Sequence, residues 1–339
     1  MGGRLLAMGK IFRGNLFNLR YQKRIFSAYS RRKRSNLAFW HTELNPNDFP
    51  IDGSIGKYYM DFRAKTKYPG PFDEKGIPML NYGGSLGVQY NPNAIAQFAL
   101  GLHDLYLDVG EKRYLSEFLR LSDWFVDNIH MIDSEVGLWE YKFDFEYHHY
   151  LKAPWRSALA QGQGISVLVR ANAITKESIY LEVAKKAFAS FERDIFHPGG
   201  VIYIDETGDV WLEECVTPPP THVLNGFIWA LWGVLDFYLA TGLETSRKLY
   251  ECCVRTLEKN ISKYHLGIWS RYHLAPTLLP MIASPYYHRL HIVQLRVMER
   301  LTGINKFGYY ADLWELCMNR RVYRAIAFTW KSLFKLMYY

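Results

Sequence analysis

Cysteine and long apolar runs are both scarce in this sequence of 339 residues. The four cysteines, Cys215, Cys252, Cys253 and Cys317, have neither the density of a disulfide framework nor the spacing of a zinc motif, which favours a reducing compartment. No apolar run approaches the roughly 20 residues of a spanning helix, and the N-terminus lacks a signal-peptide core and cleavage site. We expect a cytoplasmic protein, at most peripheral to the inner membrane, although the Arg-rich leader also suits a mitochondrial presequence.

Cofactor and nucleotide motifs are also missing. The sequence contains no Walker A motif, no G-x-S-x-G elbow and no H-E-x-x-H pair, and no G-x-G-x-x-G follows a predicted strand. Only the loop 83–87 bears a weak similarity to a glycine-rich turn. We therefore expect no cofactor and no metal, and a chemistry that side chains alone can perform.

Acidic residues are absent from both ends of the chain. Residues 1–34 contain ten Lys or Arg, the last 20 residues contain five more, and neither stretch contains Asp or Glu. The net charge is only +8, so the body between the ends is mildly acidic. Basic ends with interspersed aromatic residues suit an anionic membrane surface or a polyanion, with solvated tails as the alternative. We expect no nucleic-acid partner.

Aromatic residues are abundant, at 16% of the chain, with 25 tyrosines and 10 tryptophans. Flat rings with a polar edge stack on sugar faces, so this composition fits a carbohydrate-handling protein. An aromatic-rich core would give the same composition.

A helical hairpin recurs four times along the chain. Inner helices are predicted to begin near residues 95, 158, 223 and 287, at intervals of 63, 65 and 64 residues. After a short turn each is followed by a second helix, near 113–128, 178–196, 244–260 and 307–318. This period is too long for the common solenoid repeats of about 33 to 47 residues, so it favours an α/α toroid.

The predicted fold is mainly α, an (α/α)4 toroid of helical hairpins preceded by a small β-rich N-terminal region. Its parts are a basic aromatic leader (1–35), a β- and loop-rich region (36–90) with short strands such as 58–63, the helical domain (91–318) and a basic aromatic tail (319–339). Long connections, 129–157, 197–222 and 261–286, precede inner helices and must emerge at one end of the toroid. Long irregular loops usually carry function, so we expect the site there.

Two stretches carry most of the polar chemistry. From Pro285, which suits a first helical turn, Tyr287, His288 and His291 lie near a helix N-terminus, where an anionic guest is favoured. An aromatic helix start that packs on a neighbour is the alternative. The adjacent carboxylates Glu213 and Glu214 can raise the pKa of one partner, as a general base near neutral pH requires; an exposed acidic turn is the alternative.

Three long motifs connect these stretches to a known family. Residues 154–170, the segment 211–227 with its Trp-Leu-Glu-Glu, and the Tyr-His-x-x-His-Ile-x-Gln-Leu run at 287–295 resemble the C-terminal domain of D-glucuronyl C5-epimerases, enzymes of heparan sulfate and heparosan maturation. The resemblance extends from about Tyr90 to about residue 318. It implies a β-rich N-terminal part followed by an (α/α)4 barrel, and an isomerase that removes the C5 proton of a uronate and returns one to the opposite face.

The resemblance also assigns the site. It implies Glu214 as the carboxylate base, Tyr287 as the phenolic partner on the other face of the sugar, and Tyr90 in the cleft wall. A free phenol has a pKa near 10, so Tyr287 would need a neighbouring cation such as Arg289 or a histidine to act as a base. The remaining residues expected to bind substrate are Trp155, Arg156, Gln161, Gln163, Glu213, Asn225, Trp269, Arg271, Tyr272, His273, His288, Arg289 and His291.

The chain departs from the animal enzymes at residues 268–273. A catalytic-site tyrosine of that family is Trp269 here, and the carboxylate-binding arginine is replaced by Tyr272. Arg271 or His273 is therefore expected to hold the substrate carboxylate. Together with the short chain and the missing signal sequence, this favours a microbial homologue.

The expected substrate is a uronic-acid polysaccharide, heparosan-like and unsulfated, or a lipid-linked oligosaccharide, with a homodimer as the assembly to test. Two alternatives remain open. A polysaccharide lyase or glycoside hydrolase on an α/α toroid could use the same residues, since a lyase shares the C5 proton abstraction and differs in expelling the C4 substituent. A non-catalytic glycan-binding protein would not need Glu214.

Overall fold

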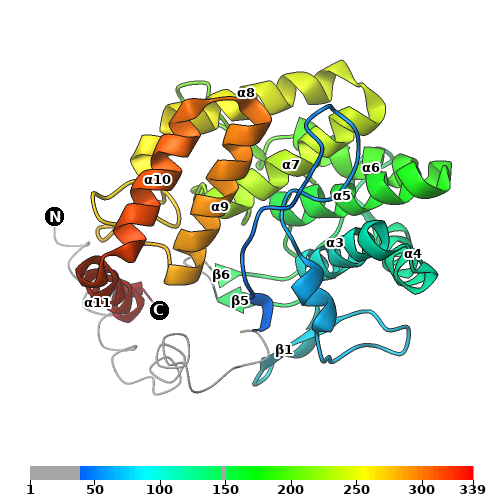
Figure 1. Cartoon of the computed structure of the whole chain (residues 1–339), viewed down its shortest axis with the longest axis horizontal. Helices are drawn as coiled ribbons and strands as arrows, with labels where there is room; N and C mark the ends of the chain where they lie inside the picture. Colours follow the sequence, from blue (N-terminus) through cyan, green and yellow to red (C-terminus); the bar gives the residue numbers. More distant parts are fainter. Residues whose placement is uncertain (1–38, 147–149, 339) are drawn as a thin grey trace.

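The computed structural model describes residues 39–146 and 150–338, so the predicted basic leader 1–35 lies outside the described residues. The described chain is mainly helical, which confirms the predicted class (Figure 1). The predicted hairpins are present as four consecutive helix pairs: α3 (Pro92–Val109) with α4 (Lys112–Asp127), α5 (Ala158–Thr175) with α6 (Ser178–Phe188), α7 (Leu224–Thr241) with α8 (Glu244–Asn260), and α9 (Pro285–Thr302) with α10 (Asn305–Asn319).

Each inner helix ends on a residue in the left-handed region, with φ between 66° and 71°. Gly110, Gly242 and Gly303 adopt this conformation without a Cβ penalty, and Lys176 adopts it as well. The backbone N–H of each capping residue bonds to a carbonyl in the last turn, so the chain reverses at once into the outer helix. These are the turns that the repeated sequence pattern predicts.

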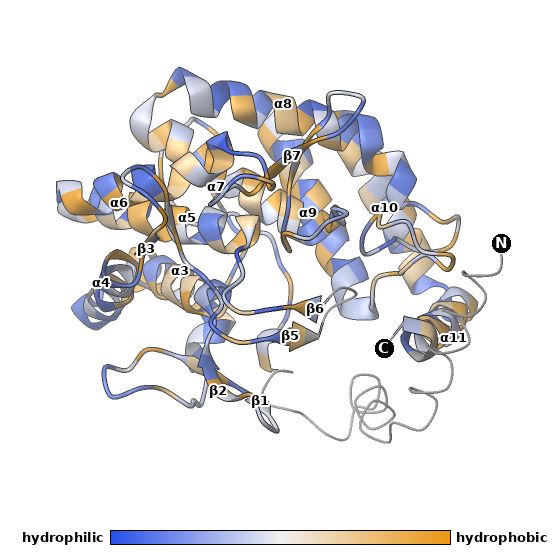
Figure 2. Cartoon of the chain, turned by 180° about the vertical axis from the view of Figure 1, so that it is seen from behind, coloured by the Kyte–Doolittle hydropathy of each residue, from blue (hydrophilic) through white to orange (hydrophobic). Residues whose placement is uncertain are grey.

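The inner helices lie side by side in the order α3, α5, α7, α9 (Figure 1). The α5–α7 contact is close because two glycines face each other: a Cβ on Gly233 would lie 2.3 Å from the Cα of Gly162. The first fourteen residues of α7 are all buried, as expected of a helix with neighbours on every side. The outer helices α4 and α8 carry hydrophilic residues along their exposed sides (Figure 2). Closure of the four hairpins into a complete toroid stays a prediction.

Strands are few and short in the described residues. They form four two-stranded antiparallel sheets: β1 (Met79–Gly83) with β2 (Gly87–Tyr90), β3 (His130–Met131) with β4 (Gly137–Leu138), β5 (Phe145–Glu146) with β6 (Tyr150–Leu151), and β7 (Ile202–Ile204) with β8 (Val210–Leu212). Short 3-10 helices occupy Arg63–Lys67 (η2), Ala189–Glu192 (η3) and Ile261–Tyr264 (η4).

The predicted strand at 58–63 is not part of a sheet. Met60 makes a single bridge to Pro46, and the chain then enters η2 at Arg63. The aromatic side chains of this segment are buried in the main core: Tyr58 and Tyr59 pack on Trp232, and Phe62 packs on Tyr58. This extended segment therefore packs on the inner helices through its side chains.

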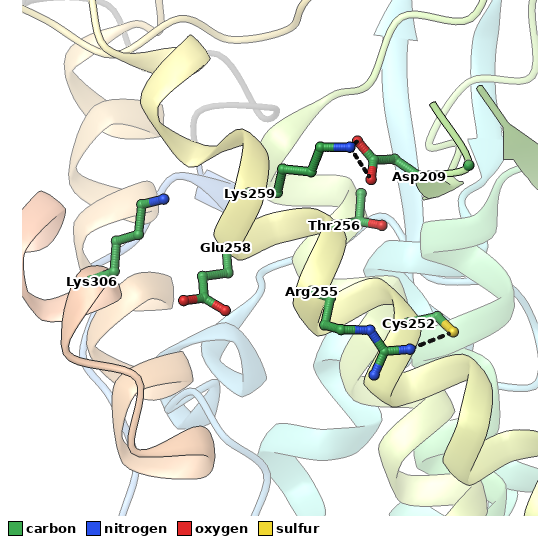
Figure 3. A pocket seen from close by; sticks show the side chains of 8 residues that line it. Asp209, Cys252, Arg255, Thr256, Glu258, Lys259 and Lys306 are labelled. Carbon is green, nitrogen blue, oxygen red and sulfur yellow. Dashed lines mark hydrogen bonds and ion pairs between the residues drawn. The ribbon is translucent and has the colours of Figure 1, made fainter. Parts of the chain in front are cut away.

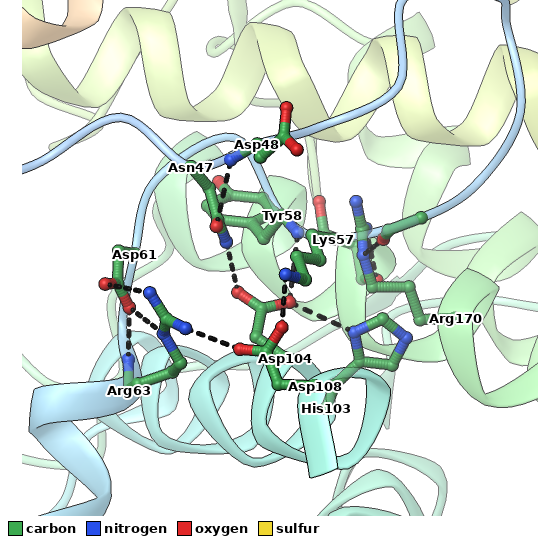
Figure 4. A network of polar contacts seen from close by, with 12 residues as sticks. Asn47, Asp48, Lys57, Tyr58, Asp61, Arg63, His103, Asp104, Asp108 and Arg170 are labelled. Atoms are coloured by element: carbon green, nitrogen blue, oxygen red, sulfur yellow. Dashed lines mark hydrogen bonds and ion pairs between the residues drawn. The ribbon is translucent and has the colours of Figure 1, made fainter. Parts of the chain in front are cut away.

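Buried polar contacts fix the same segment to α3. Asp104 accepts hydrogen bonds from the Asn47 amide at 2.6 Å and from the backbone N–H of Tyr58 at 3.2 Å (Figure 4). The ring of His103 lies 3.2 Å from the same carboxylate. Because buried carboxylates are costly unless they are hydrogen-bonded, these partners specify where the N-terminal segment docks.

The C-terminal basic segment forms helix α11 (Arg321–Tyr338), which packs on the connection before α9. Its Trp330 indole donates to the carbonyl of Pro280 at 2.9 Å, and its Lys331 ammonium donates to the carbonyl of Ile282 at 2.7 Å. A solvated tail is therefore the wrong description for residues 321–338. Across the described chain, no helix is both long and apolar enough to cross a membrane.

Candidate active site

The long connections bring Glu214 and Tyr287 together at the N-terminal ends of α7 and α9. Glu214 follows β8, and Tyr287 lies in the first turn of α9. The Ser284 hydroxyl caps this helix by accepting from the Tyr287 backbone N–H at 3.4 Å, and Pro285 occupies the first helical position. The predicted start of this helix is therefore confirmed.

The Glu214 carboxylate lies directly against the first turn of α7. The Asn225 amide donates to its Oε2 at 3.2 Å. A Cβ on Gly226 would lie 2.1 Å from that oxygen and 2.5 Å from the Glu214 Cβ, so only glycine admits the carboxylate here. Burial, and then the charge of Glu213, raises the pKa of Glu214 to about 8. Glu214 is thus poised to exchange a proton near neutral pH.

Glu213 has a different role from its neighbour. Its fully buried carboxylate accepts hydrogen bonds from the backbone N–H groups of Thr221 and His222, both at 3.1 Å, and contacts His222 Nδ1 at 2.5 Å. His222, which has a positive φ of 53°, stacks on Trp211 with ring centroids 4.1 Å apart. Glu213 therefore holds the loop that leads into α7 and leaves Glu214 free for chemistry.

Tyr287 is half-buried among other rings. Tyr272 lies against it at a centroid distance of 5.0 Å, and His41 approaches its edge at 5.8 Å. Burial, and then the charge of Glu214, raises the pKa of Tyr287 well above its usual value. The phenol is therefore a proton donor in the resting site, and it lies close enough to Glu214 to feel the charge of that carboxylate.

Aromatic residues form a wall beside Glu214. Tyr141 stacks on Trp155 with ring centroids 3.8 Å apart and planes 3° from parallel, and Phe143 packs on Tyr82 at 4.7 Å. Burial, followed by the charges of Tyr82 and Glu214, raises the pKa of Tyr141, so its hydroxyl also lies within the field of Glu214. Tyr141 and Phe143 are buried, so the partly exposed Trp155, which lines a cavity, is the ring of this wall available to the face of a sugar.

A cavity of about 410 Å³ lies next to this wall. Trp155 and Arg156 contribute to its lining, together with Tyr150, Lys152 and the segment 216–218 that follows Glu214. Two of these lining side chains, Lys152 and Arg156, are cations, which suits a ligand that carries carboxylates. Arg156 also donates to the carbonyls of Gly200 and Ile195, both at 2.7 Å, so it positions the loop as well.

Several residues predicted to bind substrate are placed in the framework. Gln161 is buried and donates to the Gly137 carbonyl at 3.0 Å, while its own carbonyl accepts from the Trp139 N–H at 2.9 Å. Gln163 is buried as well and accepts from Gln97 at 3.2 Å. These amides hold the hairpins and loops together behind the site.

Trp269, His288 and His291 form a second buried group. Trp269 stacks on His288 at 3.9 Å, and the Ser270 hydroxyl lies 2.7 Å from His288 Nδ1 and 3.0 Å from His291 Nδ1. His288 Nε2 is 3.0 Å from the Trp314 carbonyl. Burial lowers the pKa of His288 to about 4, and burial also lowers the pKa of His291 well below its usual value, so both rings are neutral at physiological pH.

Tyr90 and Arg289 are both engaged with other residues. The Tyr90 hydroxyl donates to Asp73 at 2.6 Å and its ring faces Trp124 of α4, while Arg289 donates to Glu315 of α10 at 2.8 Å. Arg289 is therefore occupied away from Tyr287, although the sequence suggests it as a cation for that phenol.

The residues expected to hold the substrate carboxylate lie on the connection before α9. The guanidinium of half-buried Arg271 makes no ion pair with any acid in the described residues, and its Nε has no hydrogen-bond partner there. His273 is fully buried and accepts from the Ala275 N–H at 3.2 Å. Which of them holds the carboxylate stays a prediction, with Arg271 the better supplied with free donors.

Two site features were not assigned from the sequence. Tyr141 lies in a connection that was expected to be functional, but nothing in its spacing separates it from the neighbouring aromatics. Gly226 has a weak signal, because a glycine directly inside a predicted helix start costs stability and therefore suggests a close approach.

A separate cavity of about 470 Å³ lies on the outer side along α8 (Figure 3). Its lining includes Asp209, Arg255, Lys259 and Lys306, but neither Glu214 nor Tyr287. Lys259 is paired with Asp209 at 2.9 Å, and Arg255 contacts the sulfur of Cys252 at 3.0 Å. Lys259 and Arg255 are thus engaged with neighbouring side chains, and the candidate active site is taken as the region of Glu214, the carboxylate of raised pKa, and Tyr287.

A buried carboxylate of raised pKa that is electrostatically coupled to a tyrosine is a candidate proton-transfer site. Residues 132–316, more than half of the chain, match the family model described as D-glucuronyl C5-epimerase C-terminus. The chain belongs to this family, as its motifs predict, and family membership points to an epimerase.

Two relatives are similar in sequence to this chain. D-glucuronyl C5-epimerase of Caenorhabditis elegans is 29% identical over 215 residues, which are 58% of this chain and 34% of that protein. An uncharacterized protein of Methanocaldococcus jannaschii is 26% identical over 270 residues, which are 73% of this chain and 86% of that protein. The chain thus spans about a third of the curated epimerase and most of the archaeal protein.

Among solved structures, a glycoside hydrolase family 76 mannosidase from Bacteroides thetaiotaomicron is similar with a TM-score of 0.45 and 14% sequence identity. The similarity covers 70% of this chain and 60% of that chain.

Proposed function

We propose that this protein is a polysaccharide uronate C5-epimerase that converts D-glucuronate to L-iduronate residues in a heparosan-like glycan. The observation that carries the proposal is the Glu214 carboxylate, which is set on the first turn of α7, raised in pKa to about 8 and electrostatically coupled to Tyr287. Membership of the D-glucuronyl C5-epimerase family supports the reaction class. In this proposal the four hairpins form the (α/α)4 toroid that carries the site at one end.

The reaction is a proton exchange at C5. Ionised Glu214 removes the C5 proton, and the C–H electron pair moves into the adjacent carboxylate to give an enolate. The Tyr287 hydroxyl then donates its proton to C5 from the opposite face and becomes a phenolate. Solvent returns a proton to Tyr287 and takes one from Glu214. The accumulating charge on the substrate carboxylate requires a fixed donor, and we assign that role to Arg271.

The substrate is expected to lie along the wall of Tyr141 and Trp155 and the cavity that contains Lys152 and Arg156. Stacked rings bind the sugar faces and the two cations bind uronate carboxylates of neighbouring residues. A uronic-acid polymer and a lipid-linked oligosaccharide both offer this chemistry, and we place the reaction in the cytoplasm.

The test is a product analysis after incubation with heparosan. An epimerase yields intact chains with new iduronate signals by NMR, whereas a lyase yields shortened chains with the absorbance of an unsaturated uronate. Glu214→Gln should abolish the product, and Glu206→Gln, an exposed glutamate in the β7–β8 turn, is the matched control that should retain activity. An unsaturated product, or no change on any uronate polymer, would overturn the proposal.

A further inference from the structure

Helix α11 has a buried face that fixes its orientation on the domain. Ala327, Lys331 and Phe334 are buried, and the contacts of Trp330 and Lys331 with the carbonyls of residues 280 and 282 hold the helix in place. A helix held in this way must present its opposite side outward. The family match ends at residue 316, so α11 is an addition beyond the matched domain.

The exposed surface of α11 contains an aliphatic stripe, besides the exposed Phe328, Thr329, Arg321 and Arg324. Val322, Ile326 and Leu333 are 67%, 41% and 51% exposed, and their spacing of four and seven residues places them on one stripe. Leu278 is 80% exposed and lies near the C-terminal end of α11, because its N–H bonds to the hydroxyl of Tyr338. These four residues are called the α11 stripe below.

The surroundings of the α11 stripe are basic. Arg320, Arg321, Arg324 and Lys335 belong to the helix or its N-terminal boundary, and there is no Asp or Glu from residue 316 to the end of the chain. An amphipathic helix with an apolar face and a basic border, too polar to span a bilayer, is the pattern of a helix that lies in the membrane interface.

We propose that α11 docks the protein on the surface of an anionic lipid bilayer, with the α11 stripe in the headgroup boundary and the arginines on lipid phosphates. A glycan is a poor occupant of the α11 stripe itself, because its four aliphatic side chains offer neither a stacking ring nor a hydrogen bond. A bilayer of acidic lipid supplies an apolar phase for the α11 stripe and negative charge for the arginines beside it.

Helix α11 packs beside the candidate active site through its buried face, opposite the α11 stripe. Lys331 is 5.5 Å from the ring centroid of Tyr272, which packs on Tyr287, and α11 lies beside the N-terminal end of α9 (Figure 1). A bilayer bound to the α11 stripe would therefore be separated by this helix from the end of the domain where substrate binds.

The test uses the full chain and vesicles, with binding followed by co-sedimentation. We expect binding to vesicles of mixed phosphatidylcholine and phosphatidylglycerol, and much weaker binding to phosphatidylcholine alone. Ile326→Ser with Leu333→Ser should weaken the partition coefficient at least tenfold, since burying one aliphatic side chain contributes about that factor. Leu107→Ser with Leu243→Ser, two exposed leucines at the hairpin turns, is the matched control that should bind as the unmodified protein does.

A second pair of variants tests the charges. Arg321→Gln with Arg324→Gln should weaken binding to acidic vesicles by about fivefold per residue, and the loss should shrink as salt is added. Absence of vesicle binding would overturn the proposal. So would binding that the α11 variants leave unchanged, which would place the contact on the basic residues 1–34, and so would a concentration-dependent dimer that only the α11 variants dissociate.

Discussion

At the scale of single residues, adjacent glutamates acquire opposite tasks from their partners. Glu213 is held by two backbone N–H groups and His222, whereas Glu214 has one long hydrogen bond, from Asn225. A carboxylate with few donors in a buried site binds its proton more tightly, which suits a base that must work near neutral pH. Glu213 contributes the charge that raises the pKa of Glu214, and it holds the loop before α7.

The first prediction concerns the pH dependence of turnover. Because the base must be ionised and the pKa of Glu214 is raised to about 8, the rate of C5 exchange should increase as pH rises through about 8. The measurement is the rate of deuterium exchange from pH 6 to 9, with fold monitored by circular dichroism. A rate that is flat over this interval would remove Glu214 as the group that titrates.

The second prediction concerns stability at the same residue. The pKa of Glu214 is higher in the folded chain than its ordinary value of 4.5, so the folded state binds more protons than the unfolded state between these two values. The free energy of unfolding contributed by Glu214 therefore falls as pH rises from about 4.5 to about 8.

Glu214→Gln should consequently be more stable than the unmodified protein at pH 9, by about 2 kcal/mol given partial screening by water, and should lose this advantage near pH 5. Urea unfolding at the two pH values measures the difference. A variant that is equally destabilised at both would show that Glu214 carries no buried charge.

At the scale of elements, the first turn of α7 is built around the carboxylate. Gly226→Ala adds a Cβ that would overlap Glu214, although alanine is the better helix former. We predict that turnover falls at least tenfold, since displacing a reacting group by about 1 Å can cost on the order of a hundredfold, while α7 stays folded.

Gly308→Ala in α10 is the matched control, because its added Cβ meets the flexible end of the Glu299 side chain. The turnover rates and the melting temperatures of the two variants are compared with those of the unmodified protein. Equal activity in both would mean that Glu214 does not need the space at Gly226.

The sequence predicted the helices and their order well. It predicted poorly which side chains of a helix or connection face the site. The period of the hairpins predicted all four helix pairs, because a short turn and an apolar stripe recur in register, with glycine at three of the four turns. Residue spacing did not predict that Arg289 pairs with Glu315, or that Trp269 and His288 stack in the interior. A polar residue near a helix start gives the same sequence pattern whether its side chain contacts substrate or a neighbouring helix.

At the scale of the whole molecule, a buried ion pair joins the N-terminal segment to two inner helices. Arg170 of α5 contacts Asp236 of α7 at 2.6 Å and donates to the carbonyl of Gly56 at 2.9 Å, and Tyr59 donates to Asp236 at 2.8 Å. Both charged side chains are almost fully buried. The extended segment is therefore part of the same cooperative unit as the helices.

Asp236→Ala should destabilise the protein by about 3 to 5 kcal/mol, because it leaves the Arg170 charge buried without its partner. Asp312→Ala, which removes an exposed partner of Arg296, should cost less than about 1 kcal/mol. Chemical denaturation with circular dichroism measures both. Equal small losses would show that the pair does not hold the segment to the helices.

The central claim is that Glu214 and Tyr287 exchange the C5 proton of a uronate, and the most direct measurement is NMR of heparosan after incubation with the protein in D2O. We predict deuterium at C5 in intact chains that also carry iduronate, no exchange with Glu214→Gln, and loss of iduronate with Tyr287→Phe while Tyr286→Phe remains active. Deuterium incorporation by Glu214→Gln at the unmodified rate, or none with the unmodified protein on any glucuronate polymer, would contradict the account.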